Sequence, residues 1–275
     1  MNAATLDDLA NVRIQGSDKT ELLAHVALPS EPPPGPLPVL VLIHEFFGLG
    51  ESIVAKAQLL ADDLNCLVIA PDTFRGTLTD FIPQAIWLAL STPQDRVNKD
   101  LDDWLAWAAS PECGRVAGVL ADTKRIAVMG FCYGGGKAIR YTTEMRPDAA
   151  TVVWYGSPLT NPADFAKTRA PICGVFGADD VQIKQALVTK FREALEAADI
   201  EHEVVSYYGA GHAFWKDVKQ VKDEEMPVIA AYRLTTTFLE GYFGGKESFA
   251  KKRAFLEFQL NDETIGEGAV ENESD

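Results

Sequence analysis

Short apolar runs alternate with longer amphipathic stretches along most of this sequence, and this alternation limits the fold more than any other feature. Between the runs, apolar residues recur at helical spacing, as Leu187, Phe191 and Leu195 do. Strands that alternate with helices form a parallel sheet whose crossover helices cover both faces. The sequence therefore predicts an α/β fold with a mostly parallel central sheet, and its strands are expected at residues 38–45, 66–72, 125–130, 151–156, 171–177 and 202–209.

The segments around these strands complete the expected architecture. Residues 21–29 are predicted to form an outer, antiparallel strand, and helices are expected near 53–64 and 228–242, with two more between residues 72 and 125. The second of these two has Pro93 in its first turn, where proline is tolerated. Only a short polar connection separates residues 156 and 171, so a large cap domain is not expected there. An open pocket of this kind favours a small substrate.

The 275 residues suit one large domain, and no repeat or linker divides them. We expect an N-terminal extension at 1–20, an α/β domain at 21–259 and an acidic tail at 260–275. The tail is expected to be disordered, with a regulatory or partner-binding role as the less favoured alternative. It contains no basic residue and six acidic ones, Asp262, Glu263, Glu267, Glu271, Glu273 and Asp275.

Charge and composition exclude several classes of partner. The formal net charge is −15, from 40 acidic and 25 basic residues, and nucleic-acid binding requires clustered Lys and Arg. No run approaches the roughly 18 uninterrupted apolar residues of a membrane helix, and the first 15 residues lack the features of a secretory signal. The four cysteines form no CxxC pair and no metal-type spacing. We expect a cytoplasmic monomer or homodimer without a metal or organic cofactor.

A nucleophile motif follows the predicted strand at 125–130. Gly130, Cys132 and Gly134 match the pattern G-x-nucleophile-x-G, in which glycines let a strand and a helix approach closely around a strained turn. The helix N-terminus is expected to lower the thiol pKa, and the backbone N–H of Tyr133 to face a developing oxyanion. The alternatives are an inert buried cysteine and a phosphate-binding loop. The second is discounted because neither GxGxxG nor a Walker lysine pattern is present.

An acid and a histidine should follow the nucleophile in the chain, each after a strand. Asp180 follows the predicted strand at 171–177, and His212 follows the one at 202–209. The acid would hold His212 in the tautomer that accepts the nucleophile's proton. Asp179 is the alternative acid, and either aspartate would also suit a helix N-cap. Packing or surface roles are expected for the other histidines, His25, His44 and His202.

Together these motifs resemble the dienelactone hydrolase family of α/β hydrolases, which includes the carboxymethylenebutenolidases. The resemblance covers roughly residues 22–243 and rests on HEFFGL (44–49), APDTFRG (70–76), GFCYGGG (130–136), GADD (177–180) and GAGHAF (209–214). It implies an α/β-hydrolase fold. It also implies that Glu45 contacts the resting thiol and accepts its proton when substrate arrives, and that Phe46 supplies a second oxyanion N–H.

The resemblance also suggests where a substrate would bind. Basic residues in the family's pocket bind a substrate carboxylate, and the nearest matches are Arg75 and Lys216. Arg75 is shifted by one place and Lys216 replaces the usual arginine, and the two cations differ in carboxylate geometry. Dienelactone itself is therefore not assured as the substrate. Four aromatic residues are expected either to line the pocket or to pack in the core: Trp154, Phe47, Tyr133 and Phe214.

These observations predict a hydrolase that cleaves a small ester or lactone through a thioester on Cys132. The alternatives are a small-ligand binding protein with little turnover, a general esterase of neutral esters, and a glutamine amidotransferase. The last requires a glutamate two residues after its histidine, whereas Phe214 occupies that position after His212. The first remains open because a fold does not ensure turnover.

Overall fold

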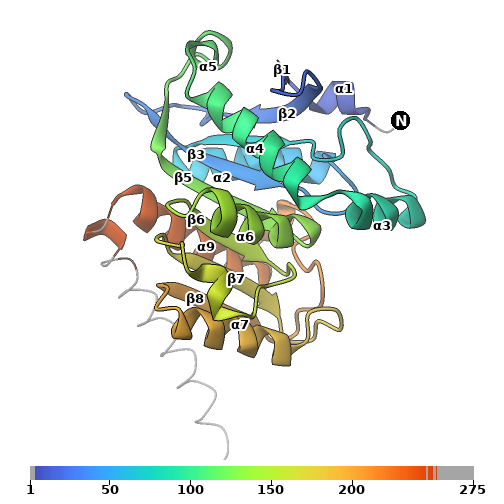
Figure 1. The fold of residues 1–275 in the computed structure, drawn as a ribbon, viewed down its shortest axis with the longest axis vertical. Helices are drawn as coiled ribbons and strands as arrows, with labels where there is room; N and C mark the ends of the chain where they lie inside the picture. The colour runs from blue at the N-terminus through green and yellow to red at the C-terminus, as the bar shows by residue number, and fades with distance from the viewer. Residues whose placement is uncertain (1–3, 246, 250–251, 253–275) are drawn as a thin grey trace, which may run out of the picture.

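The structure, a computed structural model, describes residues 4–245, 247–249 and 252 (Figure 1). Its centre is an eight-stranded sheet in the order β1-β2-β4-β3-β5-β6-β7-β8. All pairs from β4 through β8 are parallel, and β2 is antiparallel to both of its neighbours. The strands are β1 (Val12–Gln15), β2 (Glu21–Ala27), β3 (Leu37–Ile43), β4 (Leu67–Pro71), β5 (Ala121–Phe131), β6 (Ala150–Trp154), β7 (Ile172–Gly177) and β8 (His202–Tyr207).

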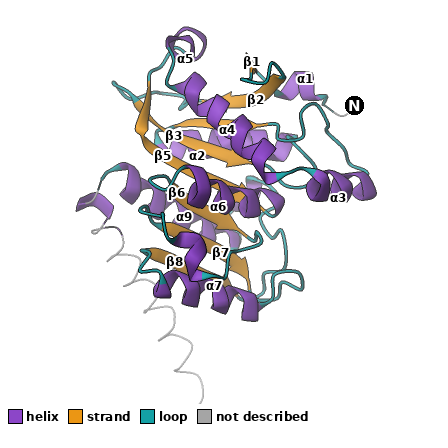
Figure 2. Cartoon of the chain, in the orientation of Figure 1, coloured by secondary structure: helices purple, strands orange, loops and turns teal. Residues whose placement is uncertain are grey.

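The central strands are apolar throughout because helices cover both faces of the sheet. Every residue of β3, β4, β6 and β7 is buried, which is typical of parallel strands enclosed on two sides. Figure 2 shows the helices in two layers around the strands. One face packs against α2 (Glu51–Leu64) and α9 (Val228–Phe243), and the other against α4 (Gln94–Ala108), α6 (Tyr133–Met145) and α7 (Gln185–Ala197). The predicted mostly parallel α/β architecture is confirmed.

Shorter elements fill the connections. They are α1 (Leu6–Leu9), α3 (Ile82–Ser91), α5 (Pro111–Ala117), the 3-10 turn η1 (Pro162–Phe165) and α8 (Lys219–Lys222). Between β6 and β7 the chain forms only η1, so no large cap lies there, as predicted. Figure 1 shows α3 at the edge of the molecule, outside the two helix layers. No helix in the described part of the chain has both the length and the apolar character needed to span a membrane.

The N-terminal segment differs from the prediction. Residues 1–20 were expected to be an extension, but β1 within them pairs with β2 and forms the edge of the sheet. The strand predicted at 21–29 is antiparallel, as expected, but it is not the outermost strand. At the other end, the acidic tail at 260–275 lies outside the described residues.

Candidate active site

The nucleophile motif forms a sharp turn between β5 and α6. Cys132 has φ +50° and ψ −112°, a conformation that non-glycine residues rarely adopt, and it immediately precedes α6. A Cβ atom on Gly130 would lie 2.2 Å from the backbone of Gly134, and one on Gly134 would lie 2.3 Å from the Ile43 carbonyl oxygen. Only glycine permits this close approach. The turn lies where the spacing predicts it, with Cys132 at its tip.

The thiol of Cys132 faces the imidazole of His212, and the carboxylate of Asp180 lies on the other side of that ring. The two partners come from loops far apart in the sequence. His212 Nε2 lies 3.1 Å from Cys132 Sγ, and His212 Nδ1 lies 2.7 Å from Asp180 Oδ2. The two loops follow β7 and β8 and are in contact, since Asp179 N–H donates to the Ala210 carbonyl at 2.9 Å. Parallel strands present their carboxyl ends at one edge of the sheet. This topology brings together the three side chains that sequence spacing singled out.

Asp180 also organises its own loop. Its Oδ1 accepts hydrogen bonds from the backbone N–H groups of Gln182 and Ile183, at 2.7 and 2.9 Å, while Oδ2 pairs with His212. Asp180 is buried, and Asp179 is exposed. The preference for Asp180 as the histidine's partner therefore matches the geometry. Asp180 also acts as a cap, as the alternative proposed. The turn that it caps, at residues 180–183, precedes α7 and is not part of that helix.

Glu45 lies at the end of β3 and is held by Tyr155. The Tyr155 hydroxyl donates to Glu45 Oε1 at 3.1 Å. In the described residues no hydrogen bond joins Glu45 to Cys132, whose thiol pairs with His212 instead. The negative charge of Glu45 nevertheless acts on the thiol and helps to raise its pKa. Sequence reasoning did not identify Tyr155, although its position directly after β6, at the same sheet edge, was a signal.

A buried histidine fixes the backbone between Glu45 and Phe46. His44 is fully buried, its Nε2 accepts from the Thr73 N–H at 3.1 Å, and its Nδ1 lies 2.6 Å from the Glu45 carbonyl oxygen. This arrangement requires the proton on Nδ1, so the ring is neutral. Burial lowers the pKa of His44, which favours the same state. The loop that carries Phe46 is therefore anchored from below by a packing histidine, as expected for His44.

These groups open into a cavity of about 700 Å³. Cys132, Tyr133 and His212 lie in its wall, as do Phe46 and Tyr155. Two predicted oxyanion residues, Phe46 and Tyr133, thus line the same space as the thiol. The rest of the wall comes from α3, from the start of α4, from α6 and from the loops after β6 and β7. It includes residues that the sequence analysis did not single out: Ile82, Ile86, Ala89, Leu90, Gln94, Gly136, Lys137, Arg140, Ser157, Gln182 and Ile183.

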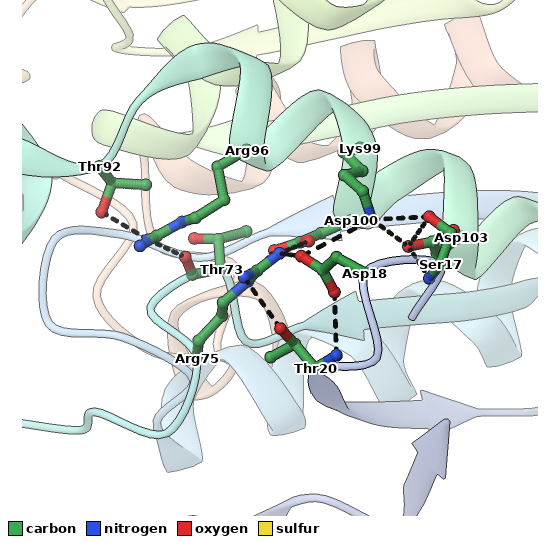
Figure 3. A network of polar contacts seen from close by, with 10 residues as sticks. All are labelled: Ser17, Asp18, Thr20, Thr73, Arg75, Thr92, Arg96, Lys99, Asp100 and Asp103. Carbon is green, nitrogen blue, oxygen red and sulfur yellow. Dashed lines mark hydrogen bonds and ion pairs between the residues drawn. The ribbon is translucent and has the colours of Figure 1, made fainter. Parts of the chain in front are cut away.

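The two predicted carboxylate-binding cations do not line this cavity. Arg75 donates to Asp100 Oδ2 and Asp18 Oδ2, each at 2.9 Å, within a polar network between the N-terminal segment and α4 (Figure 3). Its φ of +52° belongs to the turn after β4. Lys216 is exposed, and it too is absent from the cavity wall. The structure thus gives no support to a substrate-binding role for Arg75 or Lys216, and the Arg75 guanidinium is committed to carboxylates of the protein.

Of the four aromatic candidates, Tyr133 lies in the cavity wall and the other three lie outside it. Trp154 is fully buried, and its indole N–H donates to Thr235 at 3.0 Å. Phe214 packs against Trp154 with ring centroids 5.5 Å apart. Phe47 is partly exposed beside Phe46. Of the two alternatives left open for these residues, the core role applies to Trp154 and Phe214, and none of the three contributes to the pocket.

The cations that do face the cavity are Lys137 and Arg140 on α6. Lys137 Nζ donates to the Thr92 carbonyl at 2.8 Å, and Arg140 donates to the Gly136 carbonyl at 2.8 Å. No carboxylate of the described residues lies within ion-pair distance of either one. Burial lowers the pKa of Lys137, and the charges of Arg140 and Arg96 add to that effect. The cavity therefore has a positively charged side next to the nucleophile.

The resting thiol is not activated in the way the sequence suggested. Burial raises the pKa of Cys132 to about 11, and the charges of Glu45 and Asp180 raise it further, against a hydrogen bond from the Tyr133 N–H that lowers it. The N–H at the helix N-terminus acts on the thiol pKa in the predicted direction, but desolvation outweighs this single contact and the net shift is upward. The resting form is a neutral thiol.

Alkylation should show this directly. Because the thiolate is the reactive species, the reaction of Cys132 with iodoacetamide should be slow at neutral pH. It should accelerate about tenfold per pH unit as the pH rises toward the thiol pKa. Peptide mass spectrometry would follow each cysteine. Cys66 and Cys173, fully buried with pKa values raised by burial, are internal controls that should not react in the folded protein. Fast alkylation that does not change between pH 6 and 8 would instead demonstrate a resting thiolate.

Comparison with known proteins agrees with this geometry. Residues 22–243 match the family described as "Dienelactone hydrolase family". An Escherichia coli protein named "Putative carboxymethylenebutenolidase" is 34% identical, over 78% of this chain and 80% of that protein. A protein of the same name from Methylorubrum extorquens is 31% identical, over 71% of this chain and 69% of its own length. 

A solved structure is similar over nearly the same region. The crystal structure titled "Putative Dienelactone Hydrolase" from Klebsiella pneumoniae has a TM-score of 0.68 and 28% identity, and it covers 86% of this chain and 100% of that one. The eight-stranded sheet is thus the α/β-hydrolase fold that the motifs implied. With a family match that spans most of the chain and relatives above 30% identity, this protein belongs to the dienelactone hydrolase family.

Proposed function

We propose that this protein hydrolyses an ester or lactone through a covalent thioester on Cys132. The observation that carries the proposal is the pair of contacts around His212, which lies 3.1 Å from the thiol and 2.7 Å from Asp180 at the cavity wall. A nucleophile, a base and an orienting acid within hydrogen-bond reach are the arrangement that acyl transfer requires. Membership of an ester and lactone hydrolase family supports the same reaction.

The first half of the reaction forms the thioester. Cys132 Sγ attacks the substrate carbonyl carbon, and the carbonyl electron pair moves onto oxygen, where the N–H groups of Tyr133 and Phe46 would stabilise it. When the carbonyl re-forms, the C–O bond to the leaving alcohol breaks. The alcohol oxygen takes a proton from the imidazolium of His212. For a lactone, the alcohol stays attached to the acyl group.

The second half releases the acid. His212 Nε2 accepts a proton from water, whose oxygen attacks the thioester carbonyl. The C–S bond then breaks and the proton returns to sulfur, so the enzyme ends as a neutral thiol. Asp180 stays ionised throughout and holds the Nδ1 proton of His212. No other reactant is required.

Formation of the nucleophile is the step in which Glu45 would act. The resemblance implies that Glu45 accepts the thiol proton when substrate binds. Two observations support this role: its charge raises the thiol pKa, and Tyr155 holds its carboxylate at 3.1 Å. A proton on Glu45 would remove one of the negative charges that oppose the thiolate. Passed on from Glu45 to His212, the same proton would form the imidazolium that pairs with the thiolate and later protonates the leaving alcohol.

Trapping the thioester tests the proposed function. Purified protein mixed with p-nitrophenyl acetate and quenched in acid within milliseconds should carry one acetyl group on the peptide that contains Cys132. The same peptide from the Cys132→Ser variant should carry no thioester, which hydroxylamine distinguishes from an ester by its faster cleavage. A wild-type protein that turns the ester over while every cysteine stays unmodified at all quench times would exclude the covalent route. No turnover of any ester or lactone would leave a binding protein as the correct description.

A further inference from the structure

Helix α3 forms one wall of the cavity with an uninterrupted apolar face. Ile82, Ile86 and Leu90 recur every four residues and line the cavity, and Ala89 joins them. Side chains at this spacing lie on one face of a helix. The helix carries no charged residue from Ile82 to Ser91. The cavity is therefore bounded on this side by aliphatic groups alone.

These aliphatic side chains are exposed although they line a concave site. The exposed fractions are 56% for Ile82, 47% for Ile86 and 83% for Leu90. Only Ala85 and Leu88 of this helix are buried against the protein. Large apolar side chains that remain in water within a pocket are surface that an apolar ligand would cover. Across the cavity, Phe46 and Ile183 provide further apolar surface.

The size of the cavity points the same way. Its volume of about 700 Å³ falls within the range of roughly 300–1,000 Å³ found for pockets that enclose drug-sized ligands. A small lactone held at Cys132 would leave the α3 wall in contact with water. The open pocket was expected to favour a small substrate, but its wall is built for a larger one.

We infer that α3 is a binding wall for an extended apolar group of the substrate, so that the natural substrate is an ester with an aliphatic chain or a ring system that reaches from Cys132 to Leu90. This inference rests on the proposed ester hydrolysis and specifies its substrate class. The substrate would contact the inner face of α3, formed by Ile82, Ile86 and Leu90, because this face and Cys132 line the same cavity. The outer face of the helix, where Trp87 is exposed, takes no part in it.

Two series of esters test the inference. One varies the acyl chain, from p-nitrophenyl acetate to p-nitrophenyl octanoate, and the other varies the alcohol, from methyl acetate to octyl acetate. An apolar wall should raise kcat/KM by about two- to fourfold per methylene group in one of the two series, largely through KM, until the chain passes Leu90. The series that responds identifies which side of the ester lies along α3.

Variants on the two faces of the same helix separate substrate contact from other roles. In the Ile86→Ser/Leu90→Ser double variant, the ratio of kcat/KM for the long ester to that for the short ester should fall at least tenfold. Trp87→Ser places the same residue type on the outer face, and it should keep the wild-type ratio. Serine has a similar helix propensity to isoleucine and tryptophan, so the single variant Ile86→Ser is the matched partner of Trp87→Ser and should lower the ratio in the same direction as the double variant.

The possible results distinguish this inference from the proposed function. If wild-type protein cleaves the short esters through Cys132 but shows no chain-length preference in either series, the inference is wrong and the proposed function stands. If Trp87→Ser lowers the ratio as much as the double variant, α3 acts through its outer surface, as in contact with a second copy, and the inference is again wrong. Absence of Cys132-dependent turnover with every ester would overturn the proposed function itself.

Discussion

Replacing Cys132 with alanine should lower kcat/KM for p-nitrophenyl acetate by about 10⁴-fold or more, because the variant has no atom that can attack the carbonyl. Cys132→Ser should also lose most activity. Its hydroxyl has nearly the shape of the thiol but is far less acidic, and burial beside Glu45 and Asp180 already disfavours an anion at this position. Steady-state hydrolysis with purified protein measures both effects.

The thermal midpoint is the necessary companion measurement. Cys132 has a strained backbone at the tip of a turn, but serine and alanine impose no larger side chain there, so both variants should unfold near the wild-type temperature. Cys173→Ala is the matched control, since Cys173 is also an unpaired cysteine but lies buried on β7. It should retain wild-type activity. Full ester hydrolysis by Cys132→Ala would end the cysteine mechanism.

Most of the sheet could be predicted because of how parallel strands are buried. β3, β4, β6 and β7 are covered on both faces, so their sequences are almost continuously apolar and stand out from the amphipathic helices. β1 could not be found in this way. It has four residues, two of which are exposed, and among the described strands it pairs with β2 alone, so nothing in its own sequence distinguishes it from a loop.

The catalytic candidates could be predicted because their geometry is fixed by backbone topology. Glycines that exclude any Cβ mark the turn at Cys132, and strand ends at a common edge place Asp180 and His212 beside it. Tyr155 was missed for the opposite reason. It continues an apolar strand in the sequence, and only its φ of +38° turns it away from that strand and toward Glu45.

Substrate-binding residues could not be predicted from motif positions, because a motif fixes a place along the chain but not the direction of a long side chain. Arg75 lies in the expected segment, yet Asp18 and Asp100 hold its guanidinium outside the cavity. The cations that face the cavity could have been found from their spacing along the helix that follows the nucleophile. Lys137 and Arg140 follow Cys132 by five and eight positions, about one and a half and two turns along α6, and both reach the cavity.

Asp180→Asn should reduce kcat/KM by roughly 10²- to 10⁴-fold while the fold remains intact, because the two oxygens of Asp180 have separate tasks. The asparagine carbonyl oxygen can still accept from the N–H groups of Gln182 and Ile183, which preserves the turn. Its amide NH₂, however, would donate to His212 Nδ1. The imidazole proton would then move to Nε2, the nitrogen that faces the Cys132 thiol and must be free to accept a proton during the reaction.

Asp180→Ala removes both sets of hydrogen bonds and should therefore lose stability as well as activity. A comparison of the two variants separates the effect of Asp180 on the stability of the turn from its effect on the tautomer of His212. Asp179→Asn is the control for the charge change, because Asp179 is the exposed neighbour and makes no contact with His212. It should hydrolyse esters at the wild-type rate. If Asp180→Asn stayed within a few-fold of wild type while Asp180→Ala unfolded, Asp180 would be a structural cap only, and His212 would orient itself without a carboxylate.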